Sequence, residues 1–285
     1  MIVLVSSEFD HSQHEHLASK WDWIQNILVL AYVPAAHAAQ ARNDPLFSTD
    51  VILVPDAAQA AQHLSGEKWD IVFTLEGVPA PKALVNASHQ TAALSAVSDP
   101  QDSDIRPLKL VAKEYEPKVY QVSALGGTFD YLHPGHKILL SMAAWITTSK
   151  LIAGVTDDAL LTKKANKQYI QPISERTANV TSFVRMFKPS IECDAVPIQD
   201  VYGPTGWDPN IQALVVSRET LGGASSVAQL RSEKSLPALD LFVIDVISSS
   251  SVVLPEQDTA VLRESKLSST HIREWLARKE ESRNK

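Results

Sequence analysis

Apolar runs alternate with helical and turn-forming segments along the chain, and the alternation is most regular after residue 115. In this part we expect buried strands at 119–125, 150–155, 190–198, 211–217 and 240–247. Amphipathic helices are expected between and after them, at 136–147, 175–187, 226–234 and 268–279. Strands that are apolar throughout and separated by helices indicate an α/β protein with a parallel sheet covered on both faces.

The first part of the chain shows a shorter version of the same pattern. Apolar runs at 2–5, 27–33, 51–55 and 70–75 predict strands, and the segment 56–64 predicts a helix that Asp56 would cap. A following segment rich in Ser, Ala, Asp and Gln shows little periodicity. The pattern therefore predicts a smaller N-terminal α/β domain of unknown role at 1–83, a linker or long surface excursion at 84–114, and a larger α/β domain at 115–285.

Composition and charge narrow the class of protein. Of the 285 residues, 45% are apolar and 21% are charged, which is typical of a globular protein, and the single Cys193 is expected to be a small core residue. The net charge of −7 argues against nucleic acid as a partner, because binding to a phosphate backbone needs a basic face. The N-terminus lacks the basic start of a signal peptide, and the apolar window 27–39 is too short to cross a bilayer. We therefore expect a cytoplasmic protein without a membrane partner.

One polar turn between two apolar runs carries most of the candidate chemistry: ALGGTFDYLHPGHKILL, residues 124–140. It follows a predicted strand and leads into a predicted helix, whose free backbone N–H groups favour an anion. Its paired glycines allow the backbone to approach a ligand closely. The hydroxyl of Thr128 and the imidazoles of His133 and His136 can donate to phosphate oxygens. The turn is therefore expected to hold a phosphate group.

The sequence GGTFDYLHPGH in this turn resembles the GTFDxxHxGH signature of the (H/T)xGH nucleotidyltransferase superfamily. A second element of that superfamily is an (I/L)SSTxxR motif at the start of a late helix, and KLSSTHIREW at 266–275 matches it. Hydroxyls and free N–H groups at the start of that helix would face a triphosphate. A rival segment, ISSSSV at 247–252, also follows a strand but has no Arg three residues on, so we interpret it as a loop.

Three further stretches, QPISER, DVYGPTGWDP and VVSRET, are similar to the phosphopantetheine adenylyltransferases of the eukaryotic and archaeal type. The resemblance covers about residues 115–280 and implies an α/β fold with a Rossmann-like parallel sheet nucleotidyltransferase domain. It implies transfer of the adenylyl group of ATP to 4'-phosphopantetheine, giving dephospho-coenzyme A and pyrophosphate, in coenzyme A biosynthesis. Mg²⁺ is expected as a cofactor that accompanies ATP. Other enzymes of coenzyme A synthesis are expected as further partners.

The resemblance also implies roles for individual residues. His136 would stabilise charge on the α-phosphoryl group, Lys164 would neutralise the phosphates, and Thr128 would place the nucleophilic phosphate. Lys163 stays open as an alternative to Lys164. The implied ATP-binding residues are Gly126, Gly127, Thr128, Phe129, His133, His136, Ser217, Arg218, Glu219, Thr220, Ser268, Ser269, Thr270 and Arg273. The implied phosphopantetheine-binding residues are Thr128, Lys163, Lys164, Asp200, Val201, Tyr202 and Arg231. No protein metal ligands are expected, because Mg²⁺ would be held largely by phosphate oxygens.

Two alternatives to this assignment stay open, and so does the role of one residue. Another nucleotidyltransferase activity, such as that of a cytidylyltransferase acting on a phosphorylated alcohol, would use the same two motifs. A catalytically inactive scaffold subunit of the pathway would keep the fold without the activity. For Arg218, a salt-bridged surface role competes with a phosphate contact.

Overall fold

The computed structural model describes residues 1–65, 69–75, 90–94, 117–244 and 268–283. Its centre is a five-stranded parallel sheet with the strand order β7-β6-β5-β8-β9. The strands are β5 (Tyr120–Gly127), β6 (Thr147–Thr156), β7 (Glu192–Ile198), β8 (Ala213–Ser217) and β9 (Asp240–Ile244). The order reverses between β5 and β8, and ligands of such sheets bind at the carboxyl ends of the strands beside this point. The prediction of an α/β fold with a Rossmann-like parallel sheet is confirmed.

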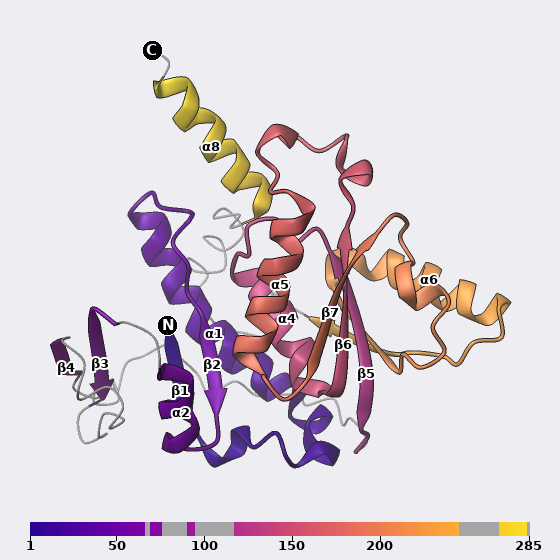
Figure 1. Cartoon of the computed structure of the whole chain (residues 1–285), viewed down its shortest axis with the longest axis horizontal. Coiled ribbons are helices and arrows are strands. Elements are labelled where there is room, and N and C mark those ends of the chain that lie inside the picture. Colours follow the sequence, from indigo (N-terminus) through magenta and orange to yellow (C-terminus); the bar gives the residue numbers. More distant parts are fainter. Residues whose placement is uncertain (66–68, 76–89, 95–116, 245–267, 284–285) are drawn as a thin grey trace, which may run out of the picture.

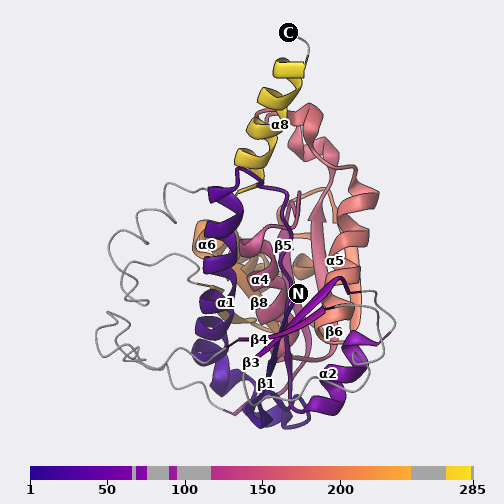
Figure 2. The ribbon, with the colours of Figure 1, turned by 90° about the vertical axis from the view of Figure 1, so that its left-hand side faces the viewer.

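Helices cover both faces of this sheet (Figures 1 and 2). α4 (Pro134–Ile146) and α5 (Ile173–Phe187) lie on one face, and α6 (Leu221–Glu233) lies on the other. The last helix, α8 (Ser269–Arg283), projects away from the sheet and ends near the C-terminus. All four helices agree with the sequence prediction, except that α6 begins at Leu221 rather than at 226.

The strand side chains alternate between the two faces, as the period of two in a β-strand requires. Leu125, Leu151, Ala153, Val215 and Phe242 belong to the larger hydrophobic cluster, which contains the buried residues of α4 and α5. Their neighbours Ala124, Ile152, Leu214 and Val216 belong to a second cluster with Ala224 and Val227 of α6. Both faces are therefore buried, which explains why these strands are apolar throughout.

A 21-residue helix, α1 (Trp21–Ala41), occupies the segment in which the sequence predicts a strand at 27–33. That prediction is wrong. Trp21, Ile24 and Leu28 are all buried at helical spacing, so one face of the helix packs against the protein. Pro34 lies on the exposed side, and the helix continues through it to Ala41. A short apolar run is compatible with a buried strand and with a buried helix, and here tertiary packing selects the helix.

Two small parallel strand pairs lie outside the main sheet. β1 (Ile2–Val5) pairs with β2 (Val51–Val54), and β3 (Ile71–Leu75) pairs with β4 (Gln90–Leu94). Helix α2 (Ala57–Leu64) follows β2, and Asp56 accepts a hydrogen bond from the Gln59 backbone N at 2.8 Å, which confirms the predicted cap. β4 lies within the predicted linker 84–114, so this part of that segment is a paired strand. The rest of the predicted linker, and the rival segment 247–252, lie outside the described residues.

The N-terminal segment (residues 1–54) shares a hydrophobic core with the larger part of the chain. The rings of Trp21 in α1 and Phe242 in β9 lie 4.8 Å apart, centroid to centroid. Trp145 in α4 donates from Nε1 to the carbonyl of Leu17 at 2.8 Å. One cluster of buried side chains contains residues from both parts. The predicted domain boundaries at 83 and 115 stay a prediction, but described residues on both sides of them bury apolar surface against each other.

None of the described helices combines the length and the apolar character that a membrane-spanning helix needs.

Candidate active site

The turn after β5 follows a constrained backbone path. Phe129 and Tyr131 have positive φ angles of 51° and 46°, a region that is uncommon for residues other than glycine and asparagine. The Phe129 ring is fully buried beneath Gly127, where an added Cβ atom would approach the ring to 3.0 Å. A side chain at 127 would therefore press against the Phe129 ring. Thr128 and Asp130, on either side of that buried ring, are left to make polar contacts.

The two histidines of the turn stack against each other at the start of α4. The ring centroids of His133 and His136 lie 3.9 Å apart, with an angle of 28° between the planes. Burial, followed by the charge of Lys137, lowers the pKa of His133 to about 4. Burial, followed by interaction with His133 and Lys164, lowers the pKa of His136 well below its ordinary value. Both imidazoles are therefore neutral at pH 7, and each can donate one hydrogen bond and accept another.

A loop after the 3₁₀ helix η4 (Asp158–Leu161) brings a lysine to the turn. Lys164 Nζ donates to Thr128 Oγ1 at 3.0 Å. Burial, followed by the nearby charge of Arg273, lowers the pKa of Lys164. The ammonium group of Lys163 makes no hydrogen bond or ion pair with another described residue. Of the two predicted lysines, Lys164 is the one that the structure brings to Thr128.

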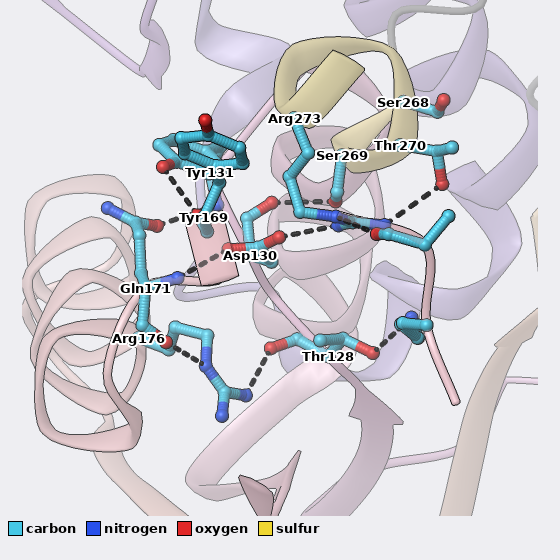
Figure 3. A network of polar contacts seen from close by, with 12 residues as sticks. Thr128, Asp130, Tyr131, Tyr169, Gln171, Arg176, Ser268, Ser269, Thr270 and Arg273 are labelled. Atoms are coloured by element: carbon cyan, nitrogen blue, oxygen red, sulfur yellow. Dashed lines mark hydrogen bonds and ion pairs between the residues drawn. The ribbon is translucent and has the colours of Figure 1, made fainter. Parts of the chain in front are cut away.

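Helix α8 joins the same turn through a buried ion pair (Figure 3). Arg273 Nη1 donates to Asp130 Oδ2 at 2.6 Å, and both side chains are buried. Ser269 Oγ donates to the Asp130 carbonyl at 2.7 Å, and Arg273 Nε donates to the Ala165 carbonyl at 3.1 Å in the loop that carries Lys164. Ser268 Oγ accepts from the backbone N of His271 at 3.3 Å, the pattern of an N-cap residue. The two sequence motifs and the lysine loop therefore meet around Asp130.

A second buried arginine, Arg176, holds the other side of the turn. Its Nη1 donates to the carbonyls of Thr128 and Thr156 at 2.8 Å each, and its Nε donates to the Gln171 carbonyl at 2.9 Å. It also pairs with the carboxylate of Asp158. The Gln171 side chain accepts from the backbone N of Tyr131 at 2.7 Å, and its own backbone N donates to Asp130 Oδ1 at 3.0 Å. Arg176 thus ties the ends of β5 and β6 to the start of α5.

The predicted adenosine contacts lie at the carboxyl end of the neighbouring strand. β8 ends at Ser217, and η7 (Arg218–Thr220) follows it directly. Ser217 and Thr220 form a reciprocal capping box, so this short turn is locally fixed. Leu125 pairs with Val215 in the sheet, which puts the ends of β5 and β8 at the same edge. The segment therefore borders the turn after β5, and its contact with adenosine stays a prediction.

Of the predicted pantetheine-binding residues, Asp200 and Val201 after β7 are exposed, whereas Arg231 is buried. Asp200 Oδ1 accepts from the backbone N of Tyr202 and of Gly203, at 2.8 and 2.7 Å, in an exposed turn after β7. Val201 in that turn is 68% exposed, so its side chain is open to a ligand. Arg231, by contrast, is only 1% exposed.

The guanidinium of Arg231 is occupied by the protein itself. It donates to the carbonyls of Pro237 at 2.7 Å, Thr205 at 2.7 Å and Asp208 at 3.0 Å. These bonds join α6 to the 3₁₀ helix η6 (Gly203–Gly206) and to the loop after it. These three bonds use Nε and Nη1, while Nη2 is buried without a hydrogen-bond partner among the described residues. Arg231 therefore braces the fold, and its predicted contact with substrate stays a prediction.

Sequence reasoning missed Asp130, Gln171 and Arg176 as organisers of the site. Asp130 lies in the GGTFD motif, and Gln171 and Arg176 lie in the QPISER stretch. Both stretches contributed to the resemblance, but the sequence analysis gave these three residues no role. Their positions indicated the family, but the contacts that join them to the turn span 41 positions between Asp130 and Gln171, 48 between Thr128 and Arg176, and 143 between Asp130 and Arg273. Cys193 is half-buried in β7, and burial raises the pKa of its thiol to about 11.

The arrangement is suited to holding an anion between neutral donors and a fixed cation. The stacked imidazoles, the Thr128 hydroxyl and the Lys164 ammonium are all possible donors to phosphate oxygens. The carboxylates of Asp130 and Asp158 are already paired with arginines. Among the described residues there is no group of three or more His, Cys, Asp or Glu side chains that could hold a metal ion.

Comparison with known proteins agrees with this chemistry. The model of the family described as cytidylyltransferase-like matches residues 124–275, which contain both motifs. The chain is 45% identical over 157 residues to the phosphopantetheine adenylyltransferase of Saccharomyces cerevisiae, an alignment that covers 55% of this chain and 49% of that protein. It is 36% identical over 124 residues to the phosphopantetheine adenylyltransferase of Pyrobaculum aerophilum, covering 43% of this chain and 78% of that protein.

Among solved structures, the chain is similar to a protein of unknown function from Archaeoglobus fulgidus, with 32% sequence identity and a TM-score of 0.41. The match covers 47% of this chain and 95% of that protein. The chain spans about half the length of the yeast relative that it matches.

Proposed function

Since the chain belongs to the cytidylyltransferase-like family and groups there with phosphopantetheine adenylyltransferases, we propose that it adenylylates 4'-phosphopantetheine. ATP would supply the adenylyl group, and the products would be dephospho-coenzyme A and pyrophosphate. The observation that carries the proposal is the meeting of both motifs at Asp130, where Arg273 and Ser269 of α8 contact the turn after β5. A triphosphate lying across this junction would touch the starts of α4 and α8 at once.

The reaction would be a direct displacement at the α-phosphorus of ATP. An oxygen of the phosphopantetheine phosphate forms the new bond, while the bond to the bridging oxygen of the leaving pyrophosphate breaks. Thr128 and Lys164, joined at 3.0 Å, would hold the attacking phosphate. His136, neutral at pH 7, would donate a hydrogen bond to the α-phosphoryl oxygen where charge grows. The hydroxyls at the start of α8 would receive the outer phosphates.

Mg²⁺ would enter the site on the triphosphate of ATP and neutralise its charge. The carboxylates of Asp130 and Asp158 are both paired with arginines, so phosphate oxygens would supply most of the Mg²⁺ ligands. The residues of this chain would then contribute positive charge and hydrogen-bond donors rather than a protein cage.

Pyrophosphate release tests the proposal directly. The protein is incubated with 4'-phosphopantetheine and Mg²⁺, and with either ATP or CTP. We expect release with ATP and a product with the mass of dephospho-coenzyme A. Release with CTP only would indicate a cytidylyltransferase, and no release with either nucleotide would indicate an inactive scaffold.

The location and the protein partners are also proposals. The cytoplasm is proposed as its location. Other enzymes of coenzyme A synthesis are proposed as partners because they make its substrate and use its product. Affinity capture with the intact chain as bait would test the second proposal.

A further inference from the structure

Lys137, the residue after His136, is clamped by the N-terminal segment. Its Nζ atom donates to Ser48 Oγ at 2.7 Å, to the Thr49 carbonyl at 2.7 Å and to Asp50 Oδ1 at 2.6 Å. The Lys137 side chain is 5% exposed. All three donor positions of its ammonium are therefore satisfied by three consecutive residues that lie almost ninety positions earlier in the chain.

The clamp residues are themselves held in place by the N-terminal fold. The backbone N of Ile2 donates to the Asp50 carbonyl at 2.7 Å at the start of the β1–β2 pair. The backbone N of Val51 donates to the hydroxyl of Tyr32 in α1 at 3.2 Å. Strand β2 is completely buried. The segment 48–50 thus leads directly into a buried strand, and its last residue, Asp50, is bound to β1.

Lys137 also closes the first turn of the helix that carries the histidines. Its backbone N donates to the carbonyl of His133 at 3.1 Å, which is the first hydrogen bond of α4. The side chain of Lys137 therefore fixes the position of a helical turn whose other end is His133 and whose interior contains His136. A buried ammonium is expensive to leave without partners, so this turn cannot shift away from residues 48–50 at low cost.

We infer that the N-terminal segment positions the two histidines, and that Lys137 is the positioning residue through which it acts, held by Asp50 and Ser48. The inference rests on the proposed role of His136 at the α-phosphorus. Lys137 itself lies behind the turn. Its ammonium group faces the N-terminal segment, and the centroid of the Phe183 ring lies 5.9 Å from its Nζ atom. It acts on the reaction through the geometry of α4, in addition to the charge that it places near His133.

The test compares Lys137→Met and Asp50→Asn with a matched control, Lys188→Met, in the full chain. Lys188 is an equally buried lysine at the other end of α4, where its Nζ donates to the carbonyls of Trp145 at 3.1 Å and Thr147 at 2.7 Å. Each variant is assayed for pyrophosphate release below its own melting temperature. We expect kcat to fall about 10- to 100-fold for Lys137→Met and less for Asp50→Asn, with KM for ATP little changed. Lys188→Met should lose thermal stability but keep kcat.

Two further measurements separate positioning from general loss of structure. The double variant Lys137→Met/Asp50→Asn should be no slower than Lys137→Met alone, because both changes break one contact. Asp50→Glu, which keeps the carboxylate, should recover part of the lost kcat. The inference is overturned if Lys137→Met and Asp50→Asn keep kcat within about twofold of the unmodified protein, or if their effects simply multiply.

The imidazole ¹⁵N resonances of His133 and His136, recorded without substrates, make the test independent of the proposed reaction. They should move in Asp50→Asn and stay unchanged in Lys188→Met. If the unmodified protein releases no pyrophosphate, the proposed function fails, while these resonances still decide whether the N-terminal segment positions the histidines. Unmoved resonances in Asp50→Asn would contradict the inference in either case.

Discussion

Arg273 of α8 and Asp130 of the turn after β5 form an ion pair of 2.6 Å in which both side chains are almost completely buried. The two residues are 143 positions apart in sequence, and their contact brings the HPGH turn and the SSTHIR helix together. The same guanidinium reaches the Ala165 carbonyl beside Lys164. This pair is therefore the centre of the site, and its loss should affect stability and activity together.

Replacing Asp130 with Asn should destabilise the protein by about 3–5 kcal/mol, because the buried Arg273 charge loses its partner. Chemical denaturation measures the loss. Asp194→Asn, which removes one carboxylate from the half-exposed Lys150 pair at the sheet edge, is the control and should change stability little. Equal stability of the two variants would mean that the buried pair is not a structural requirement.

Replacing His136 with Ala should lower kcat by about 10²- to 10³-fold, since a donor to the growing charge at the α-phosphoryl group is lost. The fold should persist, and circular dichroism together with pyrophosphate release would show both effects. His14→Ala removes an exposed histidine in the N-terminal segment and should leave the rate unchanged. A normal rate in His136→Ala would remove the turn from the catalytic site.

Replacing Lys164 with Ala should weaken turnover more than replacing Lys163 with Ala. Lys164 contacts Thr128 at 3.0 Å, whereas the ammonium of Lys163 has no partner among the described residues. We expect a loss of about 10²-fold for the first variant, the effect of removing a charged phosphate contact, and less than about threefold for the second. The reverse order would show that the loop shifts by one residue when substrate binds.

The protein without substrate should lose stability as the pH falls from 6.5 to about 4. The pKa of His133 is lowered by burial to about 4, so in this range the unfolded chain binds a proton that the folded chain does not. Above 6.5 the residue is neutral in both states and contributes no pH dependence. His133→Asn should reduce the slope by up to about 1.4 kcal/mol per pH unit, measured by urea denaturation across the range. An unchanged slope would mean that His133 is charged in the folded protein.

Replacing Arg231 with Met should destabilise the protein without raising KM for phosphopantetheine. Its guanidinium binds three carbonyls inside the protein, so removal leaves those acceptors unsatisfied, at about 1–3 kcal/mol for each buried group. Thermal denaturation and steady-state kinetics separate the two effects. A raised KM in a fully stable variant would restore the role that the sequence predicted for this residue.

Local sequence patterns predicted most of the nucleotidyltransferase part, and the reasons are physical. Leu125 and Ala124 point to opposite buried faces, so the strand is apolar at every position and stands out in the sequence. Thr128, His133 and His136 occur within nine consecutive residues, and so their proximity follows from the chain itself. The strands of this part were predicted from their continuous apolar runs, and the turn was predicted from residues that are close together in the sequence.

The features that sequence reasoning missed depend on contacts between distant residues. The run at 27–33 forms a helix because Leu28 and Val29 pack into a core shared with the sheet, and nothing within the run indicates that partner. Arg231 donates to the carbonyls of Thr205 and Asp208, and no residue near Arg231 in the sequence indicates these contacts. The clamp on Lys137 is set by residues 87 to 89 positions away.

The shared core also sets an order of events during synthesis. Leu17 emerges from the ribosome 128 positions before its partner Trp145, an interval of roughly 6 to 25 s at ordinary elongation rates of about 5–20 residues per second. During that interval β2 can cover part of the apolar face of α1, but the surface that α4 supplies is missing. The nascent chain therefore lacks part of the cover of α1 until α4 is made, and Trp21 lacks its partner Phe242 until β9 is made, so the early chain depends on later residues for protection from aggregation.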